Sequence, residues 1–277
     1  AIEKFFEENN EGFIVNELIE LSNPNIEQKT IFIFPEGALV GINLEYLKNY
    51  KELFKRNFSD KHKIILGINT EVLENDLIKT YNSMVLLDNN LNLLQKYNKN
   101  KLVPFGEFLP FEKFFKKIGL KKITYGYESF SPGNKRELFF LNNLAFIPLI
   151  CYEIIYSGSL SSSKNANFII NISEDGWFGN SVGPHQHFSH SVFRAIEEGK
   201  NVIRSANNGI SAYIDPNGIV LSKLESTERG VLEINDYKNL EKTIFSKFGN
   251  KIFFYFIIIY ISLIFFIKIF INKREKR

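Results

Sequence analysis

The 277-residue sequence contains one cysteine, one tryptophan and four histidines. One cysteine excludes an intramolecular disulfide and a metal site built from several thiolates. The four scattered histidines argue against a metal cluster, so no metal or other cofactor is expected. The net charge is only +3, and the last five residues, KREKR, supply four positive charges and one negative. The rest of the chain is therefore neutral overall, which argues against a nucleic-acid-binding surface.

Charge is also nearly absent from residues 252–271, IFFYFIIIYISLIFFIKIFI, in which Lys268 is the only charged residue. About twenty helical residues, at about 1.5 Å each, span a hydrocarbon layer of about 30 Å. The segment therefore predicts one transmembrane helix; the alternative is a buried core helix. The basic tail 272–277 favours a cytoplasmic C-terminus, with the preceding domain on the other side of the membrane.

Residues 1–245 alternate short apolar runs with polar or amphipathic ones, which predicts an α/β layered domain. The sequence DPNG at 215–218 predicts a turn between two strands. The expected helices are Ile2–Glu8, Asn43–Lys55 and His187–Gly199. The expected strands are Ile31–Phe34, Ile64–Asn69, Ser83–Leu87, Leu138–Leu141, Ala145–Ile150, Phe168–Ile172, Val202–Ser205, Ser211–Ile214 and Ile219–Lys223.

Residues 105–130, FGEFLPFEKFFKKIGLKKITYGYESF, mix many phenylalanines with five lysines. A basic, aromatic segment of this kind suits a membrane interface or a lid over an apolar ligand. The alternative is that the phenylalanines pack on the core of the domain.

Three segments place polar groups beside apolar runs. Glu36 follows IFIF, and Cys151 ends FIPLIC. The third segment, KYNKNKLVPFGE, carries Lys96, Lys99, Lys101 and Glu107. Strand ends that meet at one edge of a sheet can combine such groups into one site.

A thiolate nucleophile, a carboxylate base and an ammonium group together suit covalent acyl transfer. Singly, each of these residues also fits an ordinary structural role.

Together these segments resemble the nitrilase superfamily, whose sites combine Glu, Lys and Cys. Its lysine lies in a Tyr-x-Lys-x-x-Leu pattern that Tyr97, Lys99 and Leu102 match, which selects Lys99. Within it, residues 25–275 are similar to the apolipoprotein N-acyltransferase family through YNKNKLVPFGEFLPFE, ICYE, DGWFG, GPHQHF, FRAIE and RSANNGISA. The resemblance implies a four-layer αββα nitrilase-like sandwich followed by one C-terminal transmembrane helix at 252–271.

The same resemblance implies a set of site residues. Cys151 would be the nucleophile, Glu36 the general base and Lys99 the cation that stabilises the oxyanion. The implied supporting groups are Glu107 as a second carboxylate, the backbone N–H of Tyr152 in the oxyanion hole, Glu153 orienting the nucleophile loop, and Trp177 beside the pocket or gating it.

The implied activity transfers a fatty acyl chain from a phospholipid to the N-terminal diacylglyceryl cysteine of apolipoproteins through a thioester on the enzyme. The implied partners are the phospholipid donor, the apolipoprotein acceptor and the membrane. A monomer in the bacterial inner membrane is expected, with its catalytic domain on the periplasmic side. The alternatives are a membrane-tethered amidase of nitrilase type, in which water resolves the thioester, and a non-catalytic interaction domain.

Two features depart from the family pattern. The sequence has Glu174 where the family usually has asparagine between serine and aspartate. The first residues, AIEKFFEENNEGF, resemble neither a signal peptide nor a membrane span. We therefore expect the chain to be the C-terminal part of a longer membrane protein, without the first strand of the domain. A missing first strand would leave a sheet edge exposed.

Overall fold

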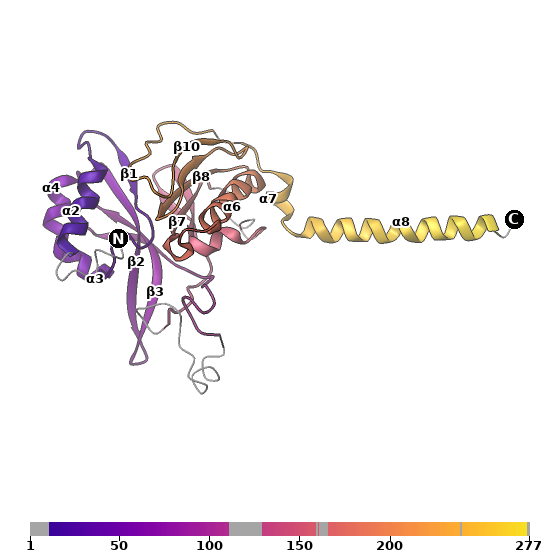
Figure 1. Ribbon diagram of the computed structural model, residues 1–277, viewed down its shortest axis with the longest axis horizontal. Coiled ribbons are helices and arrows are strands. Elements are labelled where there is room, and N and C mark those ends of the chain that lie inside the picture. The colour runs from indigo at the N-terminus through magenta and orange to yellow at the C-terminus, as the bar shows by residue number, and fades with distance from the viewer. Residues whose placement is uncertain (1–10, 111–128, 159, 161–165, 239, 276–277) are drawn as a thin grey trace.

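The computed structural model describes residues 11–110, 129–158, 160, 166–238 and 240–275. Its ten named strands form two sheets, ordered β1-β2-β3-β4 and β10-β9-β8-β7-β6-β5 (Figure 1). β1 runs parallel to β2, and β6, β7 and β8 run parallel to one another. The strands are β1 (Thr30–Ile33), β2 (His62–Glu74), β3 (Leu77–Asp88), β4 (Leu93–Asn98), β5 (Phe139–Leu141), β6 (Leu144–Ile150), β7 (Phe168–Glu174), β8 (Asn201–Asn207), β9 (Ser211–Ile214) and β10 (Val220–Leu224).

Helices cover the outer faces of the two sheets. Three helices lie over the first sheet: α2 (Glu11–Ser22), α3 (Leu44–Leu47) and α4 (Lys51–Asn57). One long helix, α6 (Gly183–Glu198), lies over the second sheet (Figure 1). The two sheets face each other between these helical layers.

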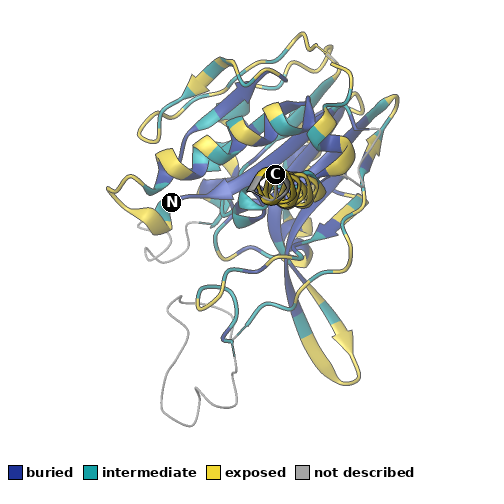
Figure 2. Cartoon of the chain, turned by 90° about the vertical axis from the view of Figure 1, so that its right-hand side faces the viewer, coloured by how far each residue is buried: buried dark blue, intermediate teal, exposed yellow. Residues whose placement is uncertain are grey.

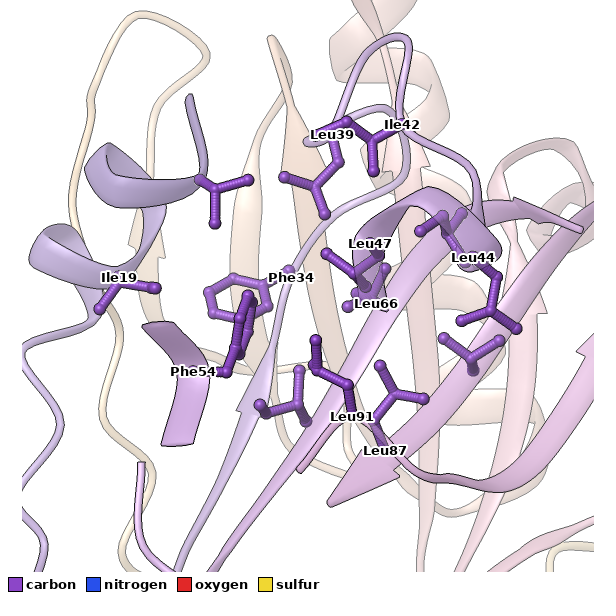
Figure 3. Packing of buried hydrophobic residues seen from close by; sticks show 14 of the residues in the cluster. Ile19, Phe34, Leu39, Ile42, Leu44, Leu47, Phe54, Leu66, Leu87 and Leu91 are labelled. Carbon is purple, nitrogen blue, oxygen red and sulfur yellow. The ribbon is translucent and has the colours of Figure 1, made fainter. Parts of the chain in front are cut away.

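Buried apolar side chains fill the spaces between the layers, and β2 shows how. Ile64 and Leu66 pack with Leu47 and Phe54 in the outer cluster, which Figure 3 shows from close by. Ile65 belongs instead to the cluster between the sheets. A strand buried on both faces needs no polar alternation, which explains its continuous apolar run.

The other two clusters complete the layer order. The cluster between the sheets contains Ile65, Met84, Leu86, Phe146, Ile150, Ile170 and Ile172. The cluster between the second sheet and α6 contains Ile147, Leu149, Ile169, Ala195, Val202, Ala212 and Ile214. Three apolar layers separating four structural layers confirm the predicted αββα sandwich.

Most predicted strands are present, but their lengths differ. β2 and β3 extend beyond the predicted runs as a hairpin that projects from the sheet (Figure 2). β4 was not predicted, because LLQKYN mixes polar and apolar residues at an edge of the first sheet. α2 was not predicted either, and the helix expected at Ile2–Glu8 lies outside the described residues.

The prediction of one helix over Asn43–Lys55 is wrong. The side chain of Asn43 accepts a hydrogen bond from the backbone N–H of Tyr46 at 2.8 Å and caps α3. A 3₁₀ turn, Lys48–Tyr50, then separates α3 from α4. The local winding therefore changes within a segment whose apolar spacing resembles that of one helix.

One predicted turn and one predicted helix end are confirmed. The DPNG turn joins β9 to β10, and the carboxylate of Asp215 accepts backbone hydrogen bonds from Asn217 at 2.9 Å and Ile219 at 2.8 Å. α6 ends at Gly199, which has a left-handed φ of 63°. α6 begins four residues before the predicted start, with Pro184 in its first turn, where a missing N–H costs nothing.

The C-terminal helix α8 (Lys251–Glu275) follows the short helix α7 (Ile244–Phe248) and projects away from the sandwich (Figure 1). Residues Lys251–Asn272 are long and apolar enough to cross a membrane, and none of their most apolar window is buried. Figure 2 shows this helix exposed, in contrast to the buried strands. The described part of the chain therefore does not bury α8 as a core helix.

The outer cluster yields a stability prediction. Leu47→Ala should lower the free energy of unfolding by about 2 to 5 kcal/mol, because Leu47 is fully buried and the change leaves a cavity. Leu73→Ala is the matched control, since Leu73 lies on the exposed hairpin. Urea denaturation measures both variants, and equal losses would contradict the packing described for α3.

Candidate active site

Cys151 lies where the buried strand β6 ends and a short 3₁₀ helix, Cys151–Ile155, begins. Its φ is 48°, a left-handed conformation that costs a residue with a side chain about 1 to 2 kcal/mol. The thiol is buried, with Sγ 4.0 Å from the carbonyl oxygen of Glu174. A strained turn at the end of a rigid strand is a common way to present a reacting group.

Glu36 follows β1 and reaches the same place. One carboxylate oxygen accepts a hydrogen bond from the side chain of Asn82 at 2.5 Å, and the other accepts from the backbone N–H of Glu174 at 3.0 Å. Glu174 therefore contacts Glu36 through its N–H and lies beside Cys151 through its carbonyl. These contacts join the end of the first sheet to the end of β7.

Lys99 follows β4 and is buried between two carboxylates. Its ammonium group donates to Glu107 at 2.9 Å and lies 3.7 Å from Glu36. Glu107 also accepts from Asn82 at 2.8 Å and from the backbone N–H of Val103 at 2.8 Å. The sequence analysis did not single out Asn82, whose amide group contacts both carboxylates.

The electrostatics of this group act on the cysteine. Burial, followed by the charge of Glu36, raises the pKa of the Cys151 thiol to about 12, although Lys99 acts in the opposite direction. Burial alone would lower the pKa of Lys99, but Glu36 and Glu107 raise it above its usual value. Cys151 is therefore a neutral thiol at rest, and it needs a base before it can attack a carbonyl.

Glu153 holds together the two loops that carry Cys151 and Lys99. One carboxylate oxygen accepts from the backbone N–H of Ile150 at 3.0 Å. The other accepts from the Tyr97 hydroxyl at 2.5 Å and from the backbone N–H groups of Asn100 at 3.1 Å and Lys101 at 3.2 Å. This buried carboxylate thus fixes the loop that carries Cys151 against the loop that carries Lys99.

The remaining predicted groups are less enclosed. Tyr152 is half-buried, and its ring packs edge-on against Tyr156 at 5.4 Å. Trp177 is 62% exposed on the 3₁₀ turn that follows Asp175. In the Phe-rich stretch, residues 111–128 lie outside the described residues. The roles of Tyr152 and Trp177, and the membrane or lid role of the Phe-rich stretch, stay predictions.

Glu174, which replaces the usual asparagine, is almost fully buried. Its carboxylate accepts from the backbone N–H of Gly176 at 2.7 Å and from the side chains of Asn207 at 2.6 Å and Asn208 at 3.0 Å. Burial raises the pKa of Glu174 to about 7, against the opposing effect of these donors, and the charge of Glu36 raises it further.

The described residues contain no group of three or more His, Cys, Asp or Glu side chains placed to hold a metal ion. The site gathers one thiol, two carboxylates and one ammonium group instead. These groups can transfer a proton, form a covalent bond to a carbonyl carbon and stabilise an oxyanion.

Comparison with known proteins identifies the family to which the chain belongs. Residues 17–235 match the family model for carbon-nitrogen hydrolase, so the chain belongs to the carbon-nitrogen hydrolase family. The apolipoprotein N-acyltransferase of Rickettsia typhi is 37% identical over 234 residues, which are 81% of this chain and 45% of that protein. The one of Wigglesworthia glossinidia brevipalpis is 35% identical over 265 residues, which are 92% and 52%. The resemblance seen in the motifs is confirmed, and the chain spans about half the length of these relatives.

Solved structures support the fold. An amidase from Nesterenkonia, of the nitrilase superfamily, superposes with a TM-score of 0.53 at 15% identity, over 78% of this chain and 81% of that one. The glutamine-dependent NAD+ synthetase from Acinetobacter baumannii gives a TM-score of 0.56 at 17% identity, over 82% and 46%. At these identities the likeness concerns the fold alone.

Glu174 yields a prediction for pH. Its pKa is raised in the fold from 4.5 to about 7, so it lowers the free energy of unfolding as the pH rises from about 4.5 through about 7. Glu174→Gln should remove this loss, which amounts to about 1 to 3 kcal/mol. Urea denaturation across this pH range measures it. Glu71→Gln, at an exposed position, is the control, and the same pH dependence in Glu174→Gln and wild type would contradict the prediction.

Proposed function

We propose that this chain carries the catalytic domain of an apolipoprotein N-acyltransferase of the bacterial inner membrane. The main support is that Glu36, Lys99 and Cys151, from three distant segments, meet at one buried site. The named relatives and the exposed apolar helix α8 add support. The substrates would be a phospholipid as acyl donor and a diacylglyceryl apolipoprotein as acceptor.

In the first half-reaction, Glu36 accepts the thiol proton of Cys151 as the sulfur attacks the ester carbonyl of the phospholipid. The Lys99 ammonium and the backbone N–H of Tyr152 stabilise the oxyanion. Glu36 then gives this proton to the ester oxygen as the carbon–oxygen bond breaks, and the lysophospholipid leaves as an alcohol. The product on the enzyme is a thioester. The raised pKa of Cys151 makes this base essential.

In the second half-reaction, the α-amino group of the acceptor attacks the thioester carbon. Glu36 takes a proton from the amine, the carbon–sulfur bond breaks, and the proton returns to the sulfur of Cys151. Glu107 acts by holding the Lys99 ammonium in place. The membrane-tethered amidase would differ in both halves, because its acyl donor would be a small amide and water would replace the acceptor amine.

The proposed topology follows from α8 and its ends. Lys273 and Arg274 come after the apolar stretch, and basic residues favour the cytoplasmic side. The sandwich before α8 would then lie on the periplasmic side. Helix α8 would hold the site close to its lipid substrate.

The central experiment is the intact mass of the purified full-length protein after incubation with phospholipid vesicles. A fatty-acyl mass increase that hydroxylamine removes is expected, and Cys151→Ala should lack it. Cys151 is the only cysteine in this chain, so the loss of the adduct in Cys151→Ala assigns the thioester to it. A folded protein without this adduct would contradict the proposal. A folded protein that forms no such adduct but hydrolyses a small amide would favour the amidase.

A second prediction concerns the choice among the lysines. Lys99→Met should lower the acylation rate at least about a hundredfold, as loss of one oxyanion-stabilising group typically does. Lys96→Met is the matched control, since Lys96 is exposed on β4 only three residues earlier. Single-turnover acylation measures both variants, after their thermal unfolding confirms the fold. A Lys99 variant that keeps the wild-type rate would overturn the assignment.

A further inference from the structure

The catalytic residues do not explain why the backbone of Cys151 stays in a left-handed conformation. The carbonyl oxygen of Cys151 lies 3.2 Å from Nε2 of His187, which comes from the first half of α6. His187 is almost fully buried, so this contact is shielded from water. It joins the nucleophile to a helix that carries none of the reacting groups.

The other ring nitrogen of His187 fixes the orientation of the ring. Nδ1 lies 2.8 Å from one carboxylate oxygen of Asp175, which also accepts a hydrogen bond from the Ser173 hydroxyl at 2.7 Å. The second carboxylate oxygen of Asp175 accepts from the Arg204 guanidinium at 2.6 Å. The ring of Phe178 packs edge-on against His187, with centroids 5.6 Å apart. The imidazole therefore has no free rotation.

The Cys151 carbonyl fixes the direction of its hydrogen bond with His187. A carbonyl oxygen can only accept, so Nε2 is the donor. Asp175 stays a carboxylate beside Nδ1, since the hydrogen bond from His187 and the charge of Arg204 lower its pKa to about 2 despite its burial. Nδ1 also lies 3.3 Å from the Arg204 guanidinium.

We infer that His187 is a positioning residue, which holds the strained backbone of Cys151 through its carbonyl so that the thiol faces Glu36 and Lys99. The inference rests on the proposed function only where phospholipid is used as the acyl donor. The contacts of Cys151 in the folded chain are the same whatever the donor is. Without the hydrogen bond, the backbone of Cys151 can relax from its left-handed conformation and turn the thiol away from its base.

The test compares His187→Gln with His187→Asn. The two side chains carry the same amide group, but only glutamine is long enough to place an N–H where Nε2 lies. We expect His187→Asn to lower the rate constant for alkylation of Cys151 by iodoacetamide about ten- to a hundredfold, because the buried carbonyl of Cys151 loses its donor. His187→Gln should stay within about threefold of wild type. His185→Asn is the control, since His185 is exposed on the same helix.

The same variants are then measured in single-turnover acylation. A lower kcat with an unchanged KM for phospholipid is expected for His187→Asn, because His187 contacts the backbone of Cys151 and not the substrate. Thermal unfolding identifies the folded variants. Equal alkylation rates for the Asn and Gln variants, or a wild-type rate for the Asn variant, overturn the inference. If the Asn variant does not fold, a Gln variant more than tenfold slower than wild type overturns it.

The two readouts separate this inference from the proposed function. Alkylation reports on Cys151 whether or not phospholipid is the donor. A wild-type protein that forms no acyl adduct would contradict the proposed function alone. A Gln variant that matches wild type while the Asn variant loses reactivity would support the positioning role in either case.

Discussion

The buried ammonium group of Lys99 is the interaction on which the rest of the site depends. A lysine almost without exposure to water is stable only where carboxylates lie against it, and Glu107 and Glu36 provide that charge. Removing one partner of such a buried group typically costs about 3 to 5 kcal/mol, because the remaining charge has no partner. Loss of one of the three charged groups would therefore destabilise the domain, so these groups have to assemble together.

This assembly also decides the resting state of the Cys151 thiol. Burial and the charge of Glu36 outweigh the Lys99 ammonium and raise the pKa of the thiol. A site that kept a permanent thiolate would need an excess of cations instead. In the proposed mechanism the sulfur becomes nucleophilic only as its proton moves to a base, which couples proton transfer to carbonyl attack.

The layers could be predicted from the sequence, whereas the full lengths of β2 and β3 and the contacts that surround the site could not. The apolar run of β2 packs on both faces of its sheet, as a strand between two apolar layers does. Asn82 gave no signal, because an asparagine in a strand has no pattern that reveals two carboxylate partners. His187 and Asp175 are twelve residues apart, and Arg204 is seventeen from His187. Their meeting depends on how α6 packs on the second sheet.

Helix α6 links the nucleophile to the start of the apolar helix. Near its beginning, His187 contacts the carbonyl of Cys151. At its end, the backbone carbonyl of Glu197 accepts from Thr243, and the carboxylate of Glu198 accepts from the Ser246 hydroxyl at 2.8 Å. Thr243 caps the start of α7, and Ser246 lies within α7, which leads directly into α8.

A second set of hydrogen bonds attaches the start of α8 to the loop that follows Cys151. The side chain of Asn250 donates to the backbone carbonyl of Ser157 at 3.0 Å, and the Ser157 hydroxyl donates to Glu197 at 3.0 Å. The beginning of α8 is therefore attached to the domain by hydrogen bonds to two segments that both lead to Cys151. If α8 crosses the membrane, this attachment sets the distance between the thiol and the lipid surface.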